Sequence, residues 1–377
     1  MASYNRRMRV AVLTESGRAE IPRGQVEQSE TVALLGYNTG NVAFQQVVAH
    51  HLTEPLAYRS WRHDPAEVAR EFDVIVIPEA SVMASGKDFG WKAHFLQSCP
   101  LPAVVLGLGF QDGHGGADPE VPNGTRRYLA LLSERATSLS VRGERSADLV
   151  NRLGITNVVI GGCPSIFWSR SPLLGAQIGT ALEELGDVAR PAACAGPDKR
   201  MLRRTNRRLF DWVSEKSGSW IVQSGRGLAA AMSGSQYVPE RRRLSVLARR
   251  RFSQRANPLF FTSGREWIEH LRSVDLSVSP RIHGAILATQ AAVPSICVVH
   301  DGRTRELAAT CRLPTVTPQQ VESSSDISEL ARSTPFDSGA FDEARRSLAR
   351  QYSSLLRASG LSPVDWLVHI GEEHSPA

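Results

Sequence analysis

Arg281 and His283, separated by one residue, could together do acid–base chemistry on a bound anion. Arginine presents a planar, permanently charged fork that matches carboxylate and phosphate groups. Histidine exchanges protons near neutral pH, and an anion beside it would favour the imidazolium, a competent general acid. Gly284 comes next and lacks a side chain, so a ligand could approach the backbone closely. Spacing alone leaves another interpretation open, in which His283 caps the helix or packs against its neighbours and Arg281 makes a surface ion pair.

The sequence around this pair, residues 275–301, is typical of a strand–helix–strand unit. Residues 275–279 alternate like the end of a strand, and residues 283–292 are rich in helix-forming Ala, Ile and Leu. A proline at 294 ends the helix, and the β-branched run at 295–299 predicts a strand buried on both faces. The pair therefore lies where a strand becomes a helix, and the free amides of a helix start attract anions.

The rest of the chain repeats this alternation, which predicts an α/β fold with mostly parallel sheets and ligands beyond the carboxyl ends of the strands. Strands are expected at residues 8–13, 32–37, 58–62, 73–78, 102–108, 138–142, 158–162, 191–195, 220–223 and 314–316. Helices are expected at residues 42–52, 65–71, 123–136, 144–153, 201–216, 266–273, 303–311 and 342–358. Residues 171–190 are interpreted as a connector, and the Ser-rich residues 319–335 as a loop or linker.

Length and composition predict a globular chain of two domains. The chain has 377 residues, of which 42% are hydrophobic and 22% charged, and it contains no apolar run long enough to span a membrane. Its N-terminus is interpreted as a first strand and not as a signal peptide. The five cysteines are far apart and form no CxxC pair, so neither a disulfide framework nor a zinc cluster is expected. A reducing cytoplasm fits this pattern.

The formal net charge of +6 is concentrated in two basic runs, residues 199–210 and 240–255. Such runs could contact nucleic acid or an anionic membrane surface, although most are solvated helix faces. Few aromatic residues are interleaved with the arginines, and no nucleic-acid-binding motif is present. We therefore expect no nucleic acid partner and retain the inner membrane face as a hypothesis.

Three further stretches supply candidate binding residues. The turn at residues 38–41, with Asn38 and Gly40, could present amides to a phosphate or a sugar. Residues 107–116 do not match the dinucleotide fingerprint, but they could form a substrate loop in which His114 acts as acid or base, unless it is merely exposed. Arg142 ends a predicted strand and Ser146 lies one turn into the next helix. Arg142 could therefore face a site or pair with a nearby acid.

Together, three pieces of this sequence resemble the polysaccharide pyruvyl transferase family. They are Asn38-Thr39-Gly40-Asn41, the run from Val141 to Ser146 together with Gly162-Cys163-Pro164-Ser165, and the run from Ser279 to Gly284. Their order and spacing match the family over about residues 30–310, and the Arg-x-His-Gly piece is the most specific. Two positions depart from the family pattern. Asn41 stands where an acidic residue is usual, and Gly143 intervenes before Glu144.

The resemblance implies two Rossmann-like domains in a B-type glycosyltransferase-like arrangement, with the active site in the inter-domain cleft. Residues 1–175 would form the acceptor domain and residues 185–335 the donor domain, followed by a C-terminal helix at 340–360. The reaction implied is transfer of pyruvate from phosphoenolpyruvate to two hydroxyls of one sugar, as a ketal, in a glycan or a lipid-linked saccharide. The resemblance implies that neither a metal nor another cofactor is required.

On this interpretation His283 protonates the donor and Arg281 binds it, with Arg142, Asn38, Gly40, Gly284, Ser146 and His114 as substrate-binding candidates. Glu79, Asp112 and His114 are candidate bases for the acceptor hydroxyl. Two alternatives remain open at this point. One is a nucleotide-sugar glycosyltransferase whose diphosphate binds Arg281 and the helix start, and the other is a non-catalytic anion- or glycan-binding protein.

Overall fold

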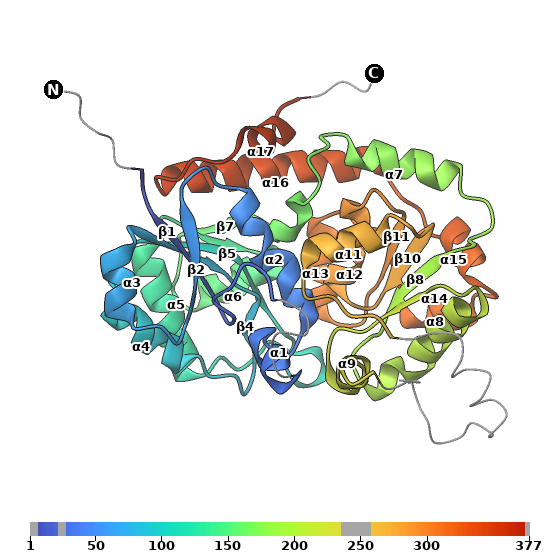
Figure 1. The fold of residues 1–377 in the computed structure, drawn as a ribbon, viewed down its shortest axis with the longest axis horizontal. Coiled ribbons are helices and arrows are strands. Elements are labelled where there is room, and N and C mark those ends of the chain that lie inside the picture. Colours follow the sequence, from blue (N-terminus) through green and yellow to red (C-terminus); the bar gives the residue numbers. More distant parts are fainter. Residues whose placement is uncertain (1–6, 22–27, 235–257, 374–377) are drawn as a thin grey trace. The chain divides into compact units, whose positions relative to one another are not determined.

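The computed structural model describes residues 7–21, 28–234 and 258–373. By internal contacts the chain divides into two compact units. Unit 1 comprises Met1–Glu20, Phe44–Arg170 and Arg345–Glu373, and unit 2 comprises Ile21–Ala43, Ser171–Ala344 and His374–Ala377. This division differs from the domain boundaries expected from the sequence, because residues 21–43 belong to unit 2. The long C-terminal helix α16 (Ser338–Ala358), red in Figure 1, is shared between the two units.

Unit 1 is built on a parallel sheet with the strand order β2-β1-β3-β5-β6-β7, to which β4 adds by pairing with β5. Its strands are β1 (Val10–Thr14), β2 (Leu56–Ser60), β3 (Val74–Pro78), β4 (Ser81–Met83), β5 (Ala103–Phe110), β6 (Leu139–Val141) and β7 (Val158–Ile160). The chain moves from β1 to one neighbour, β2, and then crosses back to the other neighbour, β3. The strand order therefore reverses between β1 and β3, which is where ligands bind in open α/β sheets.

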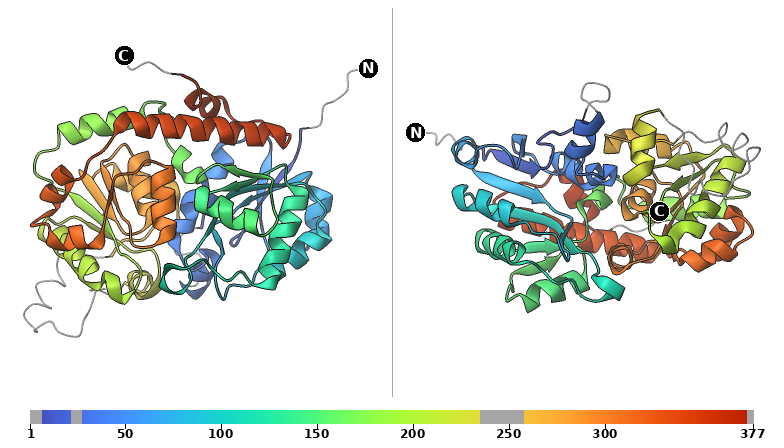
Figure 2. Two further views of the ribbon diagram at one scale, coloured as in Figure 1. Left: turned by 180° about the vertical axis from the view of Figure 1, so that it is seen from behind. Right: turned by 90° about the horizontal axis from the view of Figure 1, so that it is seen from below.

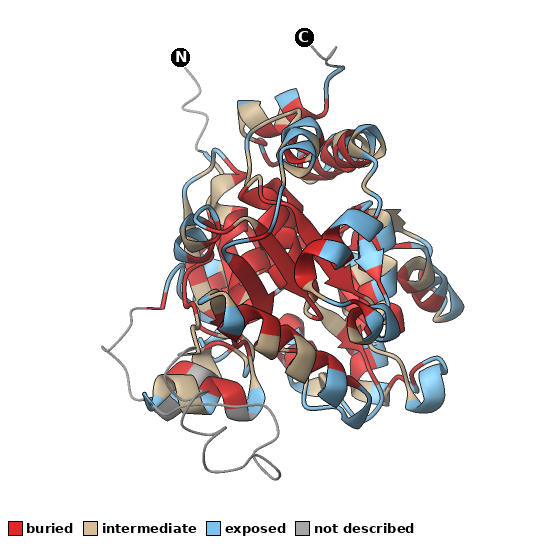
Figure 3. Ribbon diagram, turned by 90° about the vertical axis from the view of Figure 1, so that its right-hand side faces the viewer, coloured by how far each residue is buried: buried red, intermediate tan, exposed pale blue. Residues whose placement is uncertain are grey.

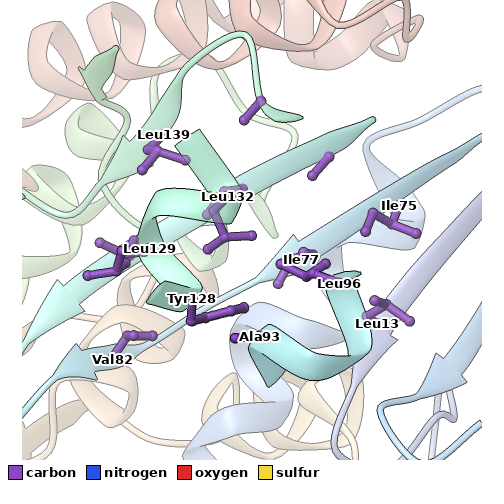
Figure 4. Packing of buried hydrophobic residues seen from close by; sticks show 14 of the residues in the cluster. Leu13, Ile75, Ile77, Val82, Ala93, Leu96, Tyr128, Leu129, Leu132 and Leu139 are labelled. Atoms are coloured by element: carbon purple, nitrogen blue, oxygen red, sulfur yellow. The ribbon is translucent and has the colours of Figure 1, made fainter. Parts of the chain in front are cut away.

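The crossovers of unit 1 place α3 to α6 on one face of the sheet, because parallel connections are right-handed. The helical elements of this unit are η2 (Val47–His50), α3 (Pro65–Glu71), α4 (Gly90–Ser98), η3 (His114–Gly116), α5 (Asn123–Arg135), α6 (Glu144–Arg152), η4 (Pro164–Phe167) and α17 (Asp365–Ile370). Figure 4 shows how α5 packs, with Leu129 and Leu132 lying over the sheet and Tyr128 extending towards Ala93 of α4. These residues form one continuous hydrophobic core with the sheet.

Unit 2 has a second parallel sheet with the order β12-β11-β10-β8-β9. Its strands are β8 (Pro191–Cys194), β9 (Ser219–Ile221), β10 (Leu276–Ser279), β11 (Ser295–Val298) and β12 (Thr315–Val316). The first strand again lies inside the sheet, with the second strand on one side and the third on the other. In this sheet the order reverses between β8 and β10, so the two units share one topology.

Helices cover both faces of the second sheet. The helical elements are α1 (Gln28–Leu34), η1 (Thr39–Asn41), α7 (Leu174–Glu183), η5 (Arg200–Leu202), α8 (Arg203–Glu215), α9 (Gly225–Met232), α11 (Gly264–Leu271), α12 (Ile282–Gln290), α13 (Gly302–Thr310), α14 (Pro318–Ser323) and α15 (Ile327–Ser333). Helix α12 packs on β10, β11 and α11, whereas α8 packs on β8, β9 and α14, and Figure 2 gives two further views of these layers. Strands β8, β10 and β11 are buried along their length, red in Figure 3, as expected for parallel strands covered on both sides.

The predicted α/β class with parallel sheets is confirmed, and most predicted strands and helices match the structure within a few residues. Four predictions were wrong. Residues 171–190 are not merely a connector, because they contain helix α7. Residues 32–37 are not a strand, because helix α1 ends there at two left-handed residues, Gly36 and Tyr37. Residues 42–52 hold α2 (Val42–Gln45) and η2 instead of one helix. Residues 319–335 are not a loop but contain α14 and α15.

The long apolar segments of this chain are strands and short helices. No helix among residues 7–21, 28–234 and 258–373 has the length and apolar character needed to cross a membrane. The first basic run, residues 199–210, forms η5 and the start of α8. The second run, residues 240–255, lies outside the described residues.

Candidate active site

The point of unit 2 where the strand order reverses is lined by side chains from three strand ends. Cys194 ends β8, Ser279 ends β10, and Gln223 follows β9 by two residues. All three are buried. Arg281 and His283 come directly after β10, at the start of α12, so the fold brings them to the position that the sequence predicted.

The guanidinium of Arg281 is held by hydrogen bonds to the loops that follow β8 and β9. Its Nε donates to the carbonyl oxygen of Ala195 at 3.3 Å, and its Nη2 donates to Oγ of Ser224 at 2.5 Å. The Ser279 hydroxyl accepts from the Arg281 amide at 3.1 Å and donates to its carbonyl at 2.6 Å. Burial lowers the pKa of Arg281 to about 10, and the nearby charge of Arg303 adds to this effect. The side chain is therefore still a cation at neutral pH.

Two more cations lie beside Asp301, a carboxylate that is itself close enough to Arg281 to influence its charge. Asp301 caps the start of α13, and its Oδ2 lies 3.4 Å from Nζ of Lys199 and 3.7 Å from Nη2 of Arg303. Burial acts to raise the pKa of Asp301, but its bond to His300 and the charge of Arg303 hold it well below its usual range. With Asp198 also nearby, three cations face two carboxylates, so this part of unit 2 favours an anion.

His283 is the second residue of α12 and is buried, and Gly40 of η1 lies against it. A methyl group at position 40 would lie 3.4 Å from Nδ1 of His283 and 2.6 Å from Oε1 of Gln223. The Asn38 side chain accepts from the Gly40 amide at 3.0 Å, and the Thr39 amide donates to the Gln223 carbonyl at 2.8 Å. The Asn38–Asn41 turn and the Arg-x-His-Gly run, far apart in sequence, thus meet within unit 2.

Gly284 has a packing role that the sequence did not reveal. The space beside its backbone is occupied by the side chains of Cys194 and Ser279, and a methyl group there would lie 2.5 Å from Oγ of Ser279. Close packing within the protein therefore requires glycine at this position, and its role in binding a ligand stays a prediction. Burial raises the pKa of Cys194 to about 11, so its thiol is protonated at neutral pH and is no nucleophile.

Arg142 and Ser146 belong to unit 1, and both are buried. Arg142 follows β6, and its Nε donates to the carbonyl oxygen of Gly107 at 2.9 Å. Its guanidinium carbon lies 5.7 Å from the ring centroid of Phe44. A methyl group at Gly109 would lie 2.7 Å from Cδ of Arg142, so a glycine near the end of β5 makes room for this arginine. Whether Arg142 binds substrate stays a prediction.

The three candidate bases differ in their surroundings. His114 opens η3 and is exposed. Asp112 pairs with Nη1 of Arg145 at 2.9 Å. Glu79 is buried and accepts from Nζ of Lys92 at 2.7 Å and from the Tyr128 hydroxyl at 2.6 Å. None of these observations assigns the base.

Sequence reasoning missed two polar residues at the end of the first sheet, Glu15 and Lys92. Glu15 directly follows β1, and its carboxylate lies 3.5 Å from Nζ of Lys92. A charged residue directly after a buried strand was the available signal for Glu15. Lys92 gave no signal, because a lysine in a helix is normally exposed, whereas here it is 3% exposed.

The chain has two parallel α/β sheets, and positive charge exceeds negative charge where the strand order of the second sheet reverses, so this end of the second sheet is suited to an anion. A family model described as polysaccharide pyruvyl transferase matches residues 43–302. The chain belongs to the polysaccharide pyruvyl transferase family and is therefore a pyruvyl transferase.

The chain is distantly similar to solved structures of nucleotide-sugar proteins. UDP-GlcNAc 2-epimerase of Methanocaldococcus jannaschii, in complex with UDP-GlcNAc and UDP, is 10% identical with a TM-score of 0.40, covering 90% of this chain and 98% of that chain. Alr3699/HepE of Anabaena, in complex with UDP-glucose, is 12% identical with a TM-score of 0.46, covering 94% and 98%. No curated protein matches this chain.

Proposed function

We propose that the enzyme transfers pyruvate from phosphoenolpyruvate to two hydroxyls of a sugar, forming a ketal and releasing phosphate. This proposal rests on the guanidinium of Arg281, which is held in place where the strand order of the second sheet reverses. His283 follows Arg281 with a single residue between them. A small, highly charged enol ester matches this site because it needs both a cation and a proton donor at close range.

Donor binding follows from the charges in unit 2. Phosphoenolpyruvate carries a carboxylate and a phosphate, and Arg281, Arg303 and Lys199 offer three cations. The dipole of α12 adds partial positive charge at the same strand end. Because the Arg281 guanidinium is already held by Ala195 and Ser224, little side-chain freedom is lost when the anion binds.

The chemistry then needs one proton and two hydroxyls. His283 gives a proton to the methylene carbon of the donor, and the adjacent carbon becomes cationic. One sugar hydroxyl adds to that carbon and loses its proton. The carbon–oxygen bond to phosphate then breaks, the second hydroxyl adds and loses its proton, and the ketal closes. The two sugar hydroxyls together release two protons. One of them balances the proton that His283 gave to form the methyl group, and phosphate takes the other. Nearby cations stabilise the leaving phosphate.

The acceptor in this proposal is a glycan or a lipid-linked saccharide, and the enzyme works in the cytoplasm. The basic residues at the start of α8, Arg203 and Arg204, are exposed and could attract the anionic inner membrane face. Sedimentation with vesicles containing anionic lipid should increase at low salt and fall as salt screens the charges. Recovery in the supernatant at every salt concentration would contradict the membrane part alone.

The test is an assay of the purified full-length protein with phosphoenolpyruvate and a panel of methyl glycosides. We expect phosphate release only when an acceptor is present, with a product heavier than the glycoside by one pyruvate less one water. His283→Ala should lower turnover by about 10²–10⁴-fold, the range for loss of a general acid. His94→Ala, which changes an exposed histidine of α4, is the matched control and should keep full activity. Release of a nucleotide from a sugar nucleotide, without reaction of phosphoenolpyruvate, would instead identify a glycosyltransferase.

A further inference from the structure

Unit 1 carries a second polar cluster at the point where its own strand order reverses. Glu15 follows β1 and Glu79 follows β3, and these are the two strands between which the order reverses. Nζ of Lys92, from α4, lies 2.7 Å from Glu79 and 3.5 Å from Glu15, so one ammonium bridges both strand ends. This position in an open parallel sheet is where a ligand is expected.

Aromatic rings complete the surroundings of the Lys92 ammonium. The ring centroids of Trp61, Phe89, Trp91 and Tyr128 lie 4.6, 5.3, 5.6 and 5.7 Å from Nζ. Trp61 also makes edge-to-face contacts with Trp91 and Tyr128. The cluster thus combines cation–π contacts with a buried ion pair, which fixes its side chains without help from a ligand.

The members of this cluster divide into an inner and an outer set. Glu79 and Tyr128 are buried, and the Tyr128 hydroxyl donates to Glu79 at 2.6 Å. Glu15 and Trp91 reach the surface: the side chain of Glu15 is 35% exposed and Trp91 is 45% exposed. Trp91 is one of the few large apolar residues that the described chain exposes. A partly exposed carboxylate and an exposed indole therefore both lie beside the same buried ammonium.

The charge of this cluster differs in sign from that of the Arg281 site. Two carboxylates face one ammonium, so the cluster has an excess of negative charge and disfavours an anion such as phosphoenolpyruvate. A carboxylate that is only partly satisfied accepts hydrogen bonds from hydroxyl groups. A flat indole offers apolar surface to the C–H face of a sugar ring. These are the two properties that a neutral polyhydroxylated ring requires.

We propose that Glu15 and Trp91 form a binding subsite for a neutral pyranoside, with Lys92, Glu79 and Tyr128 as positioning residues. The identification of this pyranoside as the acceptor of pyruvyl transfer rests on the proposed function. Burial and the charge of Glu79 raise the pKa of Tyr128 well above its ordinary value, so its hydroxyl keeps its proton and its bond to Glu79. Glu79 in turn holds Lys92, which orients Glu15.

Binding is tested directly, without turnover, by saturation-transfer NMR of the full-length protein with methyl pyranosides of galactose, glucose and mannose. We expect at least one of them to bind. Trp91→Ala should weaken that binding by about tenfold or more, the effect of losing one good contact, and Trp91→Phe should weaken it less because a ring remains. Glu15→Gln should weaken it as well. Glu67→Gln, an exposed carboxylate of α3, is the matched control and should change nothing.

Kinetics separate this proposal from the proposed function. If the enzyme uses phosphoenolpyruvate, Trp91→Ala and Glu15→Gln should raise the KM for the glycoside and leave the KM for phosphoenolpyruvate unchanged. Wild-type activity with unaltered glycoside KM in both variants would overturn the subsite and leave the transfer reaction standing. Glycoside binding that depends on Trp91, in a protein that does not consume phosphoenolpyruvate, would support the subsite and contradict the donor. Absence of binding to every glycoside, at concentrations that support turnover, would also overturn the subsite.

Discussion

Acid should destabilise this protein through one buried histidine, His51. Its ring is inaccessible to solvent and lies between η4 and α16, with Nε2 3.2 Å from the Phe167 carbonyl oxygen and Nδ1 3.1 Å from the Tyr352 hydroxyl. A carbonyl only accepts, so Nε2 carries the hydrogen and Nδ1 accepts from the tyrosine. Rings of Tyr352 and Trp366 enclose the imidazole at 5.3 and 5.6 Å.

Burial lowers the pKa of His51 from 6.5 to about 3, because the enclosing rings cannot solvate an imidazolium. Between these two values the unfolded chain binds a proton at this histidine and the folded chain does not. The free energy of unfolding therefore rises with pH through this window. The contribution is complete above pH 6.5 and is lost as the pH falls towards 3. Each pKa unit corresponds to about 1.4 kcal/mol, so the upper bound at pH 4 is about 3 kcal/mol.

The assay is urea unfolding of wild type and His51→Gln at pH 7, 5.5 and 4. Glutamine can donate to the Phe167 carbonyl and accept from Tyr352, but it does not titrate. We expect the stability difference between the two proteins to shift in favour of the variant by roughly 2–3 kcal/mol from pH 7 to pH 4. His94→Gln, in which an exposed histidine of the same unit is changed, is the control and should follow the wild type. A His51→Gln protein with the pH dependence of the wild type would refute the reasoning.

Two further predictions concern the Arg281 site. Arg281→Lys keeps the charge but cannot make both bonds, to Ala195 and Ser224, so the KM for phosphoenolpyruvate should rise by about tenfold or more; Arg305→Lys, on the exposed side of α13, should not change it. Gly40→Ala places a methyl group 2.6 Å from Gln223 and 3.4 Å from His283, so it should cost about 1–3 kcal/mol of stability by thermal unfolding and should also lower kcat. Its control is Gly339→Ala, whose methyl group has its nearest neighbour at 3.6 Å and which should be neutral or stabilising; equal effects in both glycine variants would contradict the packing argument.

The sequence predicted best those elements whose local signals agree with their burial. The strands at residues 74–78, 103–110 and 295–298 are continuous apolar runs, and a strand buried on both faces requires such runs. Helix α5 was predicted almost to its ends. The position of Arg281 and His283 was also predictable, because a proline after a strand and a helix-forming run fix where the turn must lie.

The wrong predictions arose because composition was used where helix-capping signals were present. Residues 319–335 looked like a linker because of their serines, yet Thr317 and Gln320 form a capping box that starts α14. Asp326 caps α15 by accepting hydrogen bonds from the first backbone amides of that helix, and Ile327 and Leu330 of the helix are buried. A search for helix starts would have found both helices, whereas composition could not.

What the sequence could not supply is the meeting of distant segments. The contact of Gly40 with His283 joins residues separated by most of the chain, and no local pattern predicts it. The same holds for Lys92, whose burial depends on Glu79, Trp61 and Tyr128 coming from other elements. At such positions the residue type disagrees with its observed burial or contacts, and these disagreements are most frequent at functional sites.

The two units show how one topology can serve opposite electrostatic tasks. Both sheets reverse strand order beside their first strand, but carboxylates follow β1 and β3 in unit 1, whereas Arg281 follows β10 in unit 2. A transferase with one anionic and one neutral substrate gains from this difference, because a site that repels phosphate stays free for the sugar however much donor or product is present. In this proposal the fold sets where each ligand binds, and the residue after each strand decides which ligand that is.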